Sequence, residues 1–264
     1  MMELGGISIF GLQEGLYEVA GDKRFQPVQE GAPRRPGALR VTVRPFLVIA
    51  PGHITLLDTG LGGWGSEGWG ELYANLEAHG VEPEDISCVV LTHLHPDHVG
   101  GALLEEDGFW QLAFPAAEYV IQRAEWDYAR IRPHKPPLEP LLRLLERSDQ
   151  LRLVEGSMAL NAHLELELTG GHTPGHQAIW VHGRDGSALL AGDVLASLSQ
   201  FGRRFRAKYD TDPERAYAWR TALTKRLRDR AGTVVLFYHG LHPTAIRVFP
   251  QAGTEGAYWE EVTL

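Results

Sequence analysis

The chain has 264 residues, of which 44% are hydrophobic, so it can bury a sizeable core as one large domain or two small ones. Its formal net charge is -9 and its basic residues are scattered, which argues against a nucleic-acid partner. No apolar run reaches the roughly 18 residues that span a membrane, and the N-terminus lacks the pattern of a signal peptide. A single cysteine, Cys88, excludes an intrachain disulfide. We therefore expect a soluble cytoplasmic protein with neither a nucleic-acid nor a membrane partner.

The first half of the chain has the pattern of a β-rich region. Short apolar runs predict strands at 7–10, 15–19, 39–50, 54–60 and 86–91, the third and fourth forming a hairpin. Glycine dominates residues 61–70, so we expect a mobile loop that carries Trp64 and Trp69. A helix is expected at 71–80, because Gly80 is a suitable C-terminal residue.

The middle of the chain is more helical. Residues 123–130 and 138–148 have helical spacing and flank a proline-rich segment. We expect a single domain covering 1–264, with a helical, proline-rich insertion or lid around 122–150.

Strands return after residue 150, and one long helix interrupts them. Apolar runs predict strands at 151–156, 163–169, 178–183, 187–193 and 232–240. The long helix has a clear start, with Asp212 as N-cap and Pro213 at its first position, and it carries an apolar stripe. This order of elements fits two sheets packed together with helices outside them.

The sequence THLHPDHVGG at residues 92–101 places three histidines and one aspartate within six positions. His93 and His95 are two residues apart, so on an extended segment their side chains point the same way and can bind one ion. A proline then ends the extended run, and Asp97 and His98 can face a second ion from irregular backbone or a helix start. Imidazole and carboxylate suit zinc, and also manganese, iron or cobalt, while the lack of a thiolate argues against a closed cysteine site.

Further ligands are expected from strand ends elsewhere in the chain. His172, Asp193 and His239 each follow or adjoin an apolar strand and lie beside a glycine. His242 is an alternative for the last position, and we favour His239 because it falls directly at the strand end. His176 closes the loop that contains His172, and we expect it to support a ligand rather than to bind metal.

Together these motifs resemble the metallo-β-lactamase superfamily. The resemblance covers nearly the whole chain, from LLDTG at 56–60 through the histidine cluster, GHTPGH at 171–176 and AGD at 191–193 to FYHG at 237–240. It implies an α+β fold, the four-layered αββα sandwich, and two divalent metal ions, with zinc the first choice.

The resemblance also implies a role for each site residue. One metal would be held by His93, His95 and His172, the other by Asp97, His98 and His239, with Asp193 bridging the two. Asp58 matches the family's inner acid, which orients the ligand loop through hydrogen bonds.

The expected activity is hydrolysis by a hydroxide bound to two metal ions. Two cations about 3.5–4 Å apart lower the pKa of a shared water and present hydroxide to an ester, lactone, thioester or phosphoester. Asp97 would hold that water and collect its proton while Asp193 joins the metals, so these two are the expected catalytic residues. The alternatives are a mononuclear iron sulfur dioxygenase-like oxidoreductase, a glyoxalase II-like thioesterase and a purely structural metal site.

Within the superfamily, residues 191–227 resemble the branch that contains methyl parathion hydrolase and the N-acyl homoserine lactonases. We therefore expect a small-molecule substrate, and the sequence allows a homodimer. The candidate walls of an apolar substrate pocket are Trp64, Trp69, Phe201, Phe205 and Tyr209, with core packing as the alternative. Arg203, Arg204 and Arg206 could attract an anionic substrate, although a solvated face is the commoner fate of such a run.

Overall fold

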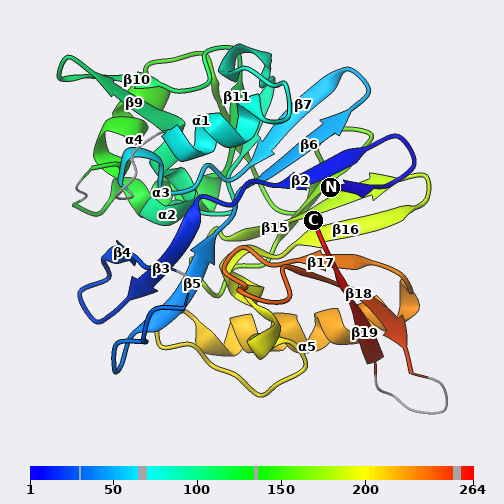
Figure 1. Cartoon of the computed structure of the whole chain (residues 1–264). Coiled ribbons are helices and arrows are strands. Elements are labelled where there is room, and N and C mark those ends of the chain that lie inside the picture. Colours follow the sequence, from blue (N-terminus) through cyan, green and yellow to red (C-terminus); the bar gives the residue numbers. More distant parts are fainter. Residues whose placement is uncertain (30, 65–69, 134–135, 252–256) are drawn as a thin grey trace.

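The computed structural model describes residues 1–29, 31–64, 70–133, 136–251 and 257–264, and it contains two seven-stranded sheets (Figure 1). In spatial order, the first sheet contains β1 (Met2–Glu3), β2 (Ser8–Gly11), β6 (Phe46–Ala50), β7 (His53–Leu57), β8 (Cys88–Val90), β11 (Glu118–Gln122) and β12 (Leu151–Val154). The second contains β13 (Met158–Ala159), β14 (Leu164–Leu168), β15 (Gln177–Gly183), β16 (Gly186–Leu190), β17 (Val234–Leu236), β18 (Ala245–Pro250) and β19 (Ala257–Val262).

Smaller elements complete the described structure. Two further sheets have the orders β4 (Phe25–Pro27), β3 (Gly15–Val19), β5 (Leu39–Val43) and β10 (Phe109–Leu112), β9 (Leu103–Glu106). The α-helices are α1 (Gly70–Glu77), α2 (Pro96–Val99), α3 (Arg123–Arg130), α4 (Leu138–Glu146) and α5 (Pro213–Asp229). Short 3-10 turns lie at Gly62–Trp64, Pro83–Asp85, Gly100–Ala102, Gly192–Leu195 and Leu198–Gln200. Among the described residues, no helix is long and apolar enough to cross a membrane.

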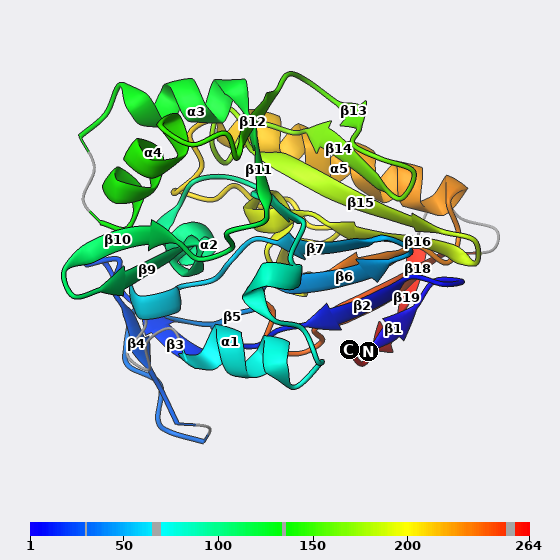
Figure 2. The ribbon, with the colours of Figure 1, turned by 90° about the horizontal axis from the view of Figure 1, so that it is seen from above.

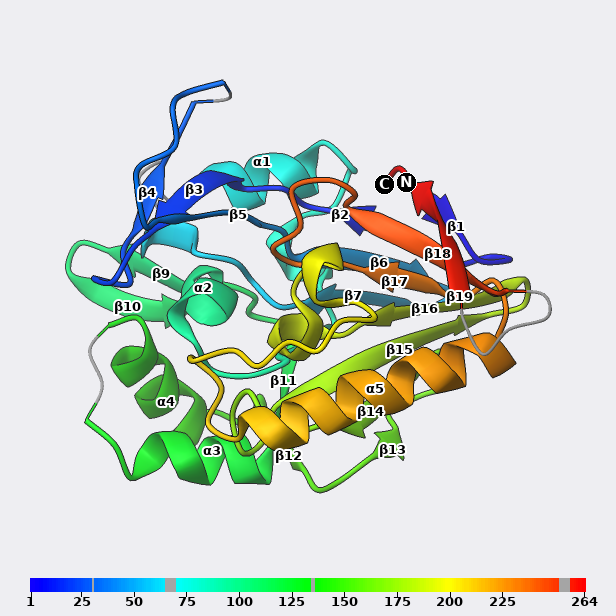
Figure 3. The same cartoon turned by 90° about the horizontal axis from the view of Figure 1, so that it is seen from below.

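Three apolar cores define the layers of the fold. The central core joins the inner faces of the two sheets, with residues such as Val48 and Val90 of the first and Ile179 and Leu236 of the second. A second core packs α1, α3 and α4 on the outer face of the first sheet, and a third packs α5 on the outer face of the second. Figure 1 shows α5 on one side of the two sheets and α1, α3 and α4 on the other, and Figure 3 views the molecule from the side of α5. The predicted four-layered αββα sandwich is therefore confirmed.

The apolar run predicted as one strand at 39–50 is divided. β5 ends before Arg44 and β6 begins after Pro45, and the two strands belong to different sheets. Proline has no backbone N–H to donate to a ladder, and the Arg44 side chain is buried and donates to the carbonyls of Phe237 and Gly240 at 3.1 and 3.0 Å. The predicted hairpin is the pair β6–β7.

The predicted insertion at 122–150 folds as α3 and α4. Figure 2 shows the two helices beside β11 and β12, and their apolar residues, including Trp126, Leu141 and Leu145, are part of the core on the first sheet. That this region acts as a lid, and that the chain is one domain, stay predictions. Trp64 lies in a 3-10 turn where a mobile loop was expected, while Trp69 lies outside the described residues.

Strand direction brings the functional loops to one edge. β7, β8, β11 and β12 are mutually parallel, and β16 and β17 are parallel in the second sheet. Parallel neighbours have their carboxyl ends at the same end of a sheet, so the segment after β7 lies beside the one after β8, and the segment after β16 beside the one after β17. The two pairs of segments meet at one end of the sandwich. The predicted site residues Asp58, His93, Asp193 and His239 follow these four strands.

The start of α5 provides a test of local stability. The Asp212 carboxylate accepts the backbone N–H of Arg215 at 3.0 Å, as predicted for an N-cap. Asp212→Ala should lower the free energy of unfolding by about 1 kcal/mol, whereas Asp212→Asn should retain most of it. Urea unfolding of the two variants checks this, and equal stabilities would contradict the capping role.

Candidate metal centre

The structure brings the seven sequence-predicted ligands together in two groups. Within each group, one candidate ligand atom per residue lies within 4.8 Å of every other. The groups are His93, His95, His172 and Asp193, and Asp97, His98 and His239. His242 is exposed and belongs to neither group, so the structure places His239 rather than its alternative in the cluster.

The backbone after β8 separates the first two histidines from the next two ligands. His93 and His95 precede α2, which begins at Pro96, and His95 is its N-cap with an extended backbone. His93 Nε2 and His95 Nδ1 are 2.9 Å apart, and His172 Nε2 lies 3.0 Å from the same His95 atom. The helical turn directs Asp97 and His98 toward His239. The change from extended to helical backbone therefore lets residues 93–98 contribute to both groups.

Asp193 lies between the two groups and turns one carboxylate oxygen toward each. Its Oδ2 is 3.3 Å from His172 Nε2 and 4.0 Å from His93 Nε2. Its Oδ1 is 3.3 Å from both His98 Nε2 and His239 Nε2. A carboxylate in this position can bind two ions at once, one through each oxygen.

Asp58 fixes the loop that carries the first ligands. Its carboxylate accepts the N–H and the hydroxyl of Thr92 at 2.7 and 2.8 Å, and it lies 2.8 Å from His98 Nδ1. The residue is fully buried and has a φ of 58°, a left-handed backbone that non-glycine residues rarely adopt. The loop is held in this conformation by three hydrogen bonds, and such strain clusters at functional sites.

Two of the other histidines have partners that the sequence analysis missed. His172 Nδ1 is 3.0 Å from the buried carboxylate of Asp210, and His239 Nδ1 donates to the backbone carbonyl of Thr42 at 2.7 Å. A partner on one ring nitrogen fixes the tautomer and directs the lone pair of the other nitrogen toward the centre. Asp210 lies in a polar stretch before α5 and Thr42 contributes only its backbone, so neither leaves a signal in the sequence.

His176 lies behind the cluster and belongs to neither group. Its Nε2 accepts the backbone N–H of Asp193 at 3.1 Å, and its Nδ1 is 2.7 Å from the hydroxyl of Thr169. Gly192 has a φ of 55°, and a Cβ there would lie 2.7 Å from His176 Nε2. Only glycine lets the chain pass this close to the ring while it turns Asp193 inward.

The protonation of the histidines suits ligation in the first group. Burial lowers the pKa of His95 to about 4, and burial together with the neighbouring imidazoles lowers the pKa of His93 well below its ordinary value. In the second group burial lowers the pKa of His239, but Asp193 and Asp97 outweigh it and raise the value to about 9. A cation added there competes with a proton, as metal binding generally does.

Two buried atoms of the cluster are without a hydrogen-bond partner among the described residues. They are His98 Nε2 and Asp193 Oδ1, which face each other across 3.3 Å. Unsatisfied buried polar atoms are costly and rare in native proteins. A metal ion that binds both atoms removes this cost, so the donor set fits a divalent cation.

The structure identifies Glu125 as a buried acid that the sequence analysis missed. Its Oε1 accepts the N–H of Leu94, between His93 and His95, and its Oε2 accepts the N–H of Gly175, both at 3.1 Å. Burial raises the pKa of this carboxyl group, although the backbone N–H groups oppose the shift. A single side chain of α3 thus ties together the two loops that supply three of the first four ligands.

One expected aromatic side chain, Tyr209, lies near the cluster, together with Phe25, which the sequence analysis missed. Tyr209 lies against His172, with 5.6 Å between ring centroids, and Phe25 lies 6.4 Å from His239. Trp64 stacks on Trp110 at 5.8 Å. Two further candidates have other contacts. Phe201 packs against the core under α5, and Phe205 lies near the Arg220 guanidinium.

Glu125→Gln should destabilise the protein by about 1–3 kcal/mol, because an amide has one accepting oxygen and leaves one buried N–H unpaired. Glu139→Gln on the exposed face of α4 is the matched control and should change stability by less than about 0.5 kcal/mol. Urea unfolding measures both variants. If Glu125→Gln is as stable as the control, the carboxylate does not hold the two loops.

Comparison with known proteins identifies a family and several relatives with similar sequences. The family model of the metallo-beta-lactamase superfamily matches residues 41–239. An N-acyl homoserine lactonase of Bacillus cereus is 28% identical over 183 residues, covering 67% of this chain and 65% of the relative. The human metallo-beta-lactamase domain-containing protein 1 is 31% identical over 208 residues, covering 76% of this chain and 63% of the relative. The chain thus spans slightly less than two thirds of the length of these curated relatives.

Solved structures share the fold over the whole chain. A probable metal-dependent hydrolase from Staphylococcus aureus has a TM-score of 0.81 and 21% identity, covering 100% of both chains. AidC, a dizinc quorum-quenching lactonase, has a TM-score of 0.78 and 23% identity, covering 100% of this chain and 97% of its own. The family match covers every residue of both donor groups, and the chain belongs to the metallo-beta-lactamase superfamily.

Proposed function

We propose that this protein is a hydrolase that uses two divalent metal ions, most simply zinc, to cleave an ester or lactone bond of a small molecule. The observation that carries the proposal is the position of Asp193, with one carboxylate oxygen toward each of two histidine-containing groups. A mononuclear iron enzyme or a structural zinc site needs only one such group.

The proposed ligand sets follow the two groups. His93, His95 and His172 would hold one ion, and Asp97, His98 and His239 the other, with Asp193 shared. When bound, two such cations lower the pKa of a water molecule that they share and polarise the carbonyl oxygen of the substrate. The nitrogen and oxygen donors suit zinc and also manganese, iron or cobalt.

Asp97 is the group best placed to take the proton of the attacking water. Burial raises its pKa, but His98 and His239 outweigh burial and hold the pKa below its ordinary value, so the carboxylate is ionised. The hydroxyl of Tyr238 donates to the backbone carbonyl of Asp97 at 2.7 Å and fixes its place in the turn. Its Oδ2 lies toward the second group, 3.2 Å from His239 Nε2 and 3.7 Å from His98 Nε2.

Lactones are the substrate class that we put first, and N-acyl homoserine lactones the first compounds to test. Relatives named as N-acyl homoserine lactonases support this choice. Phe25 and Tyr209 place aromatic rings beside His239 and His172, which suits a substrate with an apolar chain. Thioesters and phosphoesters are the alternatives with the same requirement for two ions.

The proposal predicts that purified protein opens an N-acyl homoserine lactone and that Asp193→Ala does not. Removal of the shared carboxylate should weaken retention of both metals and lower kcat/KM by about 100-fold or more, beyond the usual effect of losing an outer hydrogen-bond partner. Ring opening is followed by proton release and metal by elemental analysis. An active, fully metallated Asp193→Ala variant would contradict the bridging role, and an inactive wild type with both metals bound would direct the search to the other bonds.

The last ligand has a matched pair of variants. His239→Ala should lose about one metal equivalent per chain, because its Nε2 is the third donor of the second group. His242→Ala, three residues away and exposed, should retain both. The reverse pattern of metal contents would show that the wrong histidine was assigned.

A further inference from the structure

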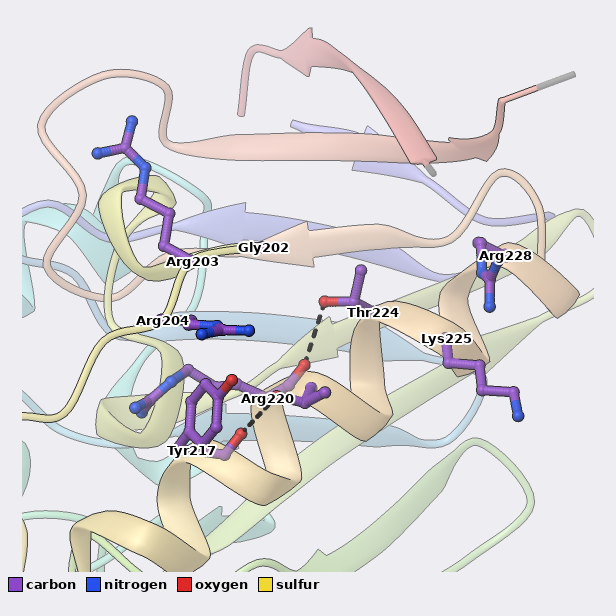
Figure 4. Close-up of a pocket in the computed structure, with 9 residues that line it drawn as sticks. Gly202, Arg203, Arg204, Tyr217, Arg220, Thr224, Lys225 and Arg228 are labelled. Atoms are coloured by element: carbon purple, nitrogen blue, oxygen red, sulfur yellow. Dashed lines mark hydrogen bonds between the residues drawn. The ribbon is translucent and has the colours of Figure 1, made fainter. Parts of the chain in front are cut away.

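A basic pocket lies between α5 and the segment that follows the last 3-10 turn, outside the candidate metal centre. It encloses about 410 Å³. The described residues that line it are Gly202, Arg203, Arg204, Tyr217, Arg220, Thr221, Thr224, Lys225 and Arg228, eight of which are labelled in Figure 4. None of them belongs to either donor group, so the pocket is separate from the proposed hydrolytic site.

The lining of the pocket carries one sign of charge. Four arginines and one lysine are present among the described lining residues, and no aspartate or glutamate. The chain as a whole has a formal net charge of -9, so this concentration of cations runs against its overall balance. Like charges held together repel one another, and a bound anion relieves that repulsion.

The cations of the pocket differ from their neighbours in how they are paired. Arg206 donates to Glu214 at 3.0 Å, and Arg226 forms an ion pair with Glu167 at 2.9 Å. Within the described part of the chain, Arg203, Arg204 and Lys225 form no ion pair. Arg206 and Arg226, just outside the pocket, are thus neutralised by acids, whereas Arg203, Arg204 and Lys225 are available to a ligand.

Arg220 anchors the inner side of the pocket. It is 3% exposed, and its guanidinium donates to the carbonyl of Val194 at 2.7 Å and to the carbonyl of Phe205. Its Nε is buried without a hydrogen-bond partner among the described residues. Burial lowers the pKa of this group, against the opposing effect of Asp210. A buried guanidinium with unused hydrogen-bonding capacity favours an anionic ligand that hydrogen-bonds to it.

The spacing of the cations indicates the kind of anion. Arg220 and Arg228 are eight residues apart on α5, which corresponds to about 12 Å along a helix. Lys225 lies between them in the sequence, and Arg203 and Arg204 come from the segment across from the helix, where Figure 4 shows the Arg204 side chain over α5 and the Arg203 side chain extending away from it. Guanidinium groups bind phosphate oxygens in a two-pronged geometry, and a lysine adds a point charge. A row of cations this long matches a chain of phosphate groups better than a single ion.

We propose that this pocket binds a small polyphosphate anion, a di- or triphosphate group of the kind carried by a nucleotide or present as the inorganic ion. The site would place that ligand against Arg220, whose contacts include the carbonyl of Val194, next to Asp193.

Charge reversal at one of two exposed lysines tests this proposal. Titration calorimetry with inorganic tripolyphosphate and with ATP is carried out on the wild type, Lys225→Glu and Lys208→Glu. Lys225 lines the pocket and Lys208 does not, while both are exposed and carry the same charge. Phosphate oxygens can also bind metal ions at the candidate metal centre, so the comparison of the two variants decides whether the ligand binds in the basic pocket. Lys225→Glu should weaken binding by about tenfold or more, and Lys208→Glu by less than about threefold.

The two ligands distinguish the sources of the phosphate chain. Equal affinities indicate recognition of the phosphates alone, and tighter binding of ATP indicates a nucleotide. The proposal is overturned if neither compound binds the wild type, or if the two variants bind as the wild type does or are weakened equally. Binding of a single-stranded oligonucleotide without binding of either small polyphosphate would overturn it as well.

Discussion

Seven ionisable side chains, buried or half-buried, lie together at one end of the sandwich, and the rest of the site is arranged around the need to satisfy them. Asp193 is central, because each of its oxygens faces a different set of histidine nitrogens. Two atoms of this set, His98 Nε2 and Asp193 Oδ1, are buried without a hydrogen-bond partner among the described residues. Burying charges without compensation is costly, so a cluster of this kind makes physical sense as a site built for metal.

The fold supports this cluster through partners on separate layers. Asp58 comes from the end of β7, Thr42 from β5, Glu125 from α3 and Asp210 from the segment before α5. Each holds either a ring nitrogen or a ligand loop, so the imidazoles are oriented before any ion binds. This orientation requires the partner residues from both sheets to meet at the same end of the sandwich.

The sequence predicts which side chains the structure brings together, because their signal is local. The spacing of His93, His95, Asp97 and His98 predicts which of these side chains point toward the same ion. A glycine beside the end of a strand predicts where the backbone can approach the centre. Glu125 and Asp210 have no such signal, since their roles arise from contacts across 31 and 38 positions of the chain. The division of 39–50 into two strands was missed for a similar reason, because the buried Arg44 that separates them is bonded to carbonyls near the end of the chain.

The central claim is that this chain holds two metal ions through one shared carboxylate. Element-resolved metal content per chain, measured on protein purified without an affinity tag or chelator, tests it most directly. The account predicts about two equivalents of zinc, manganese or a similar divalent ion. A single equivalent of iron, with the group of Asp97, His98 and His239 still empty after added zinc, would contradict it.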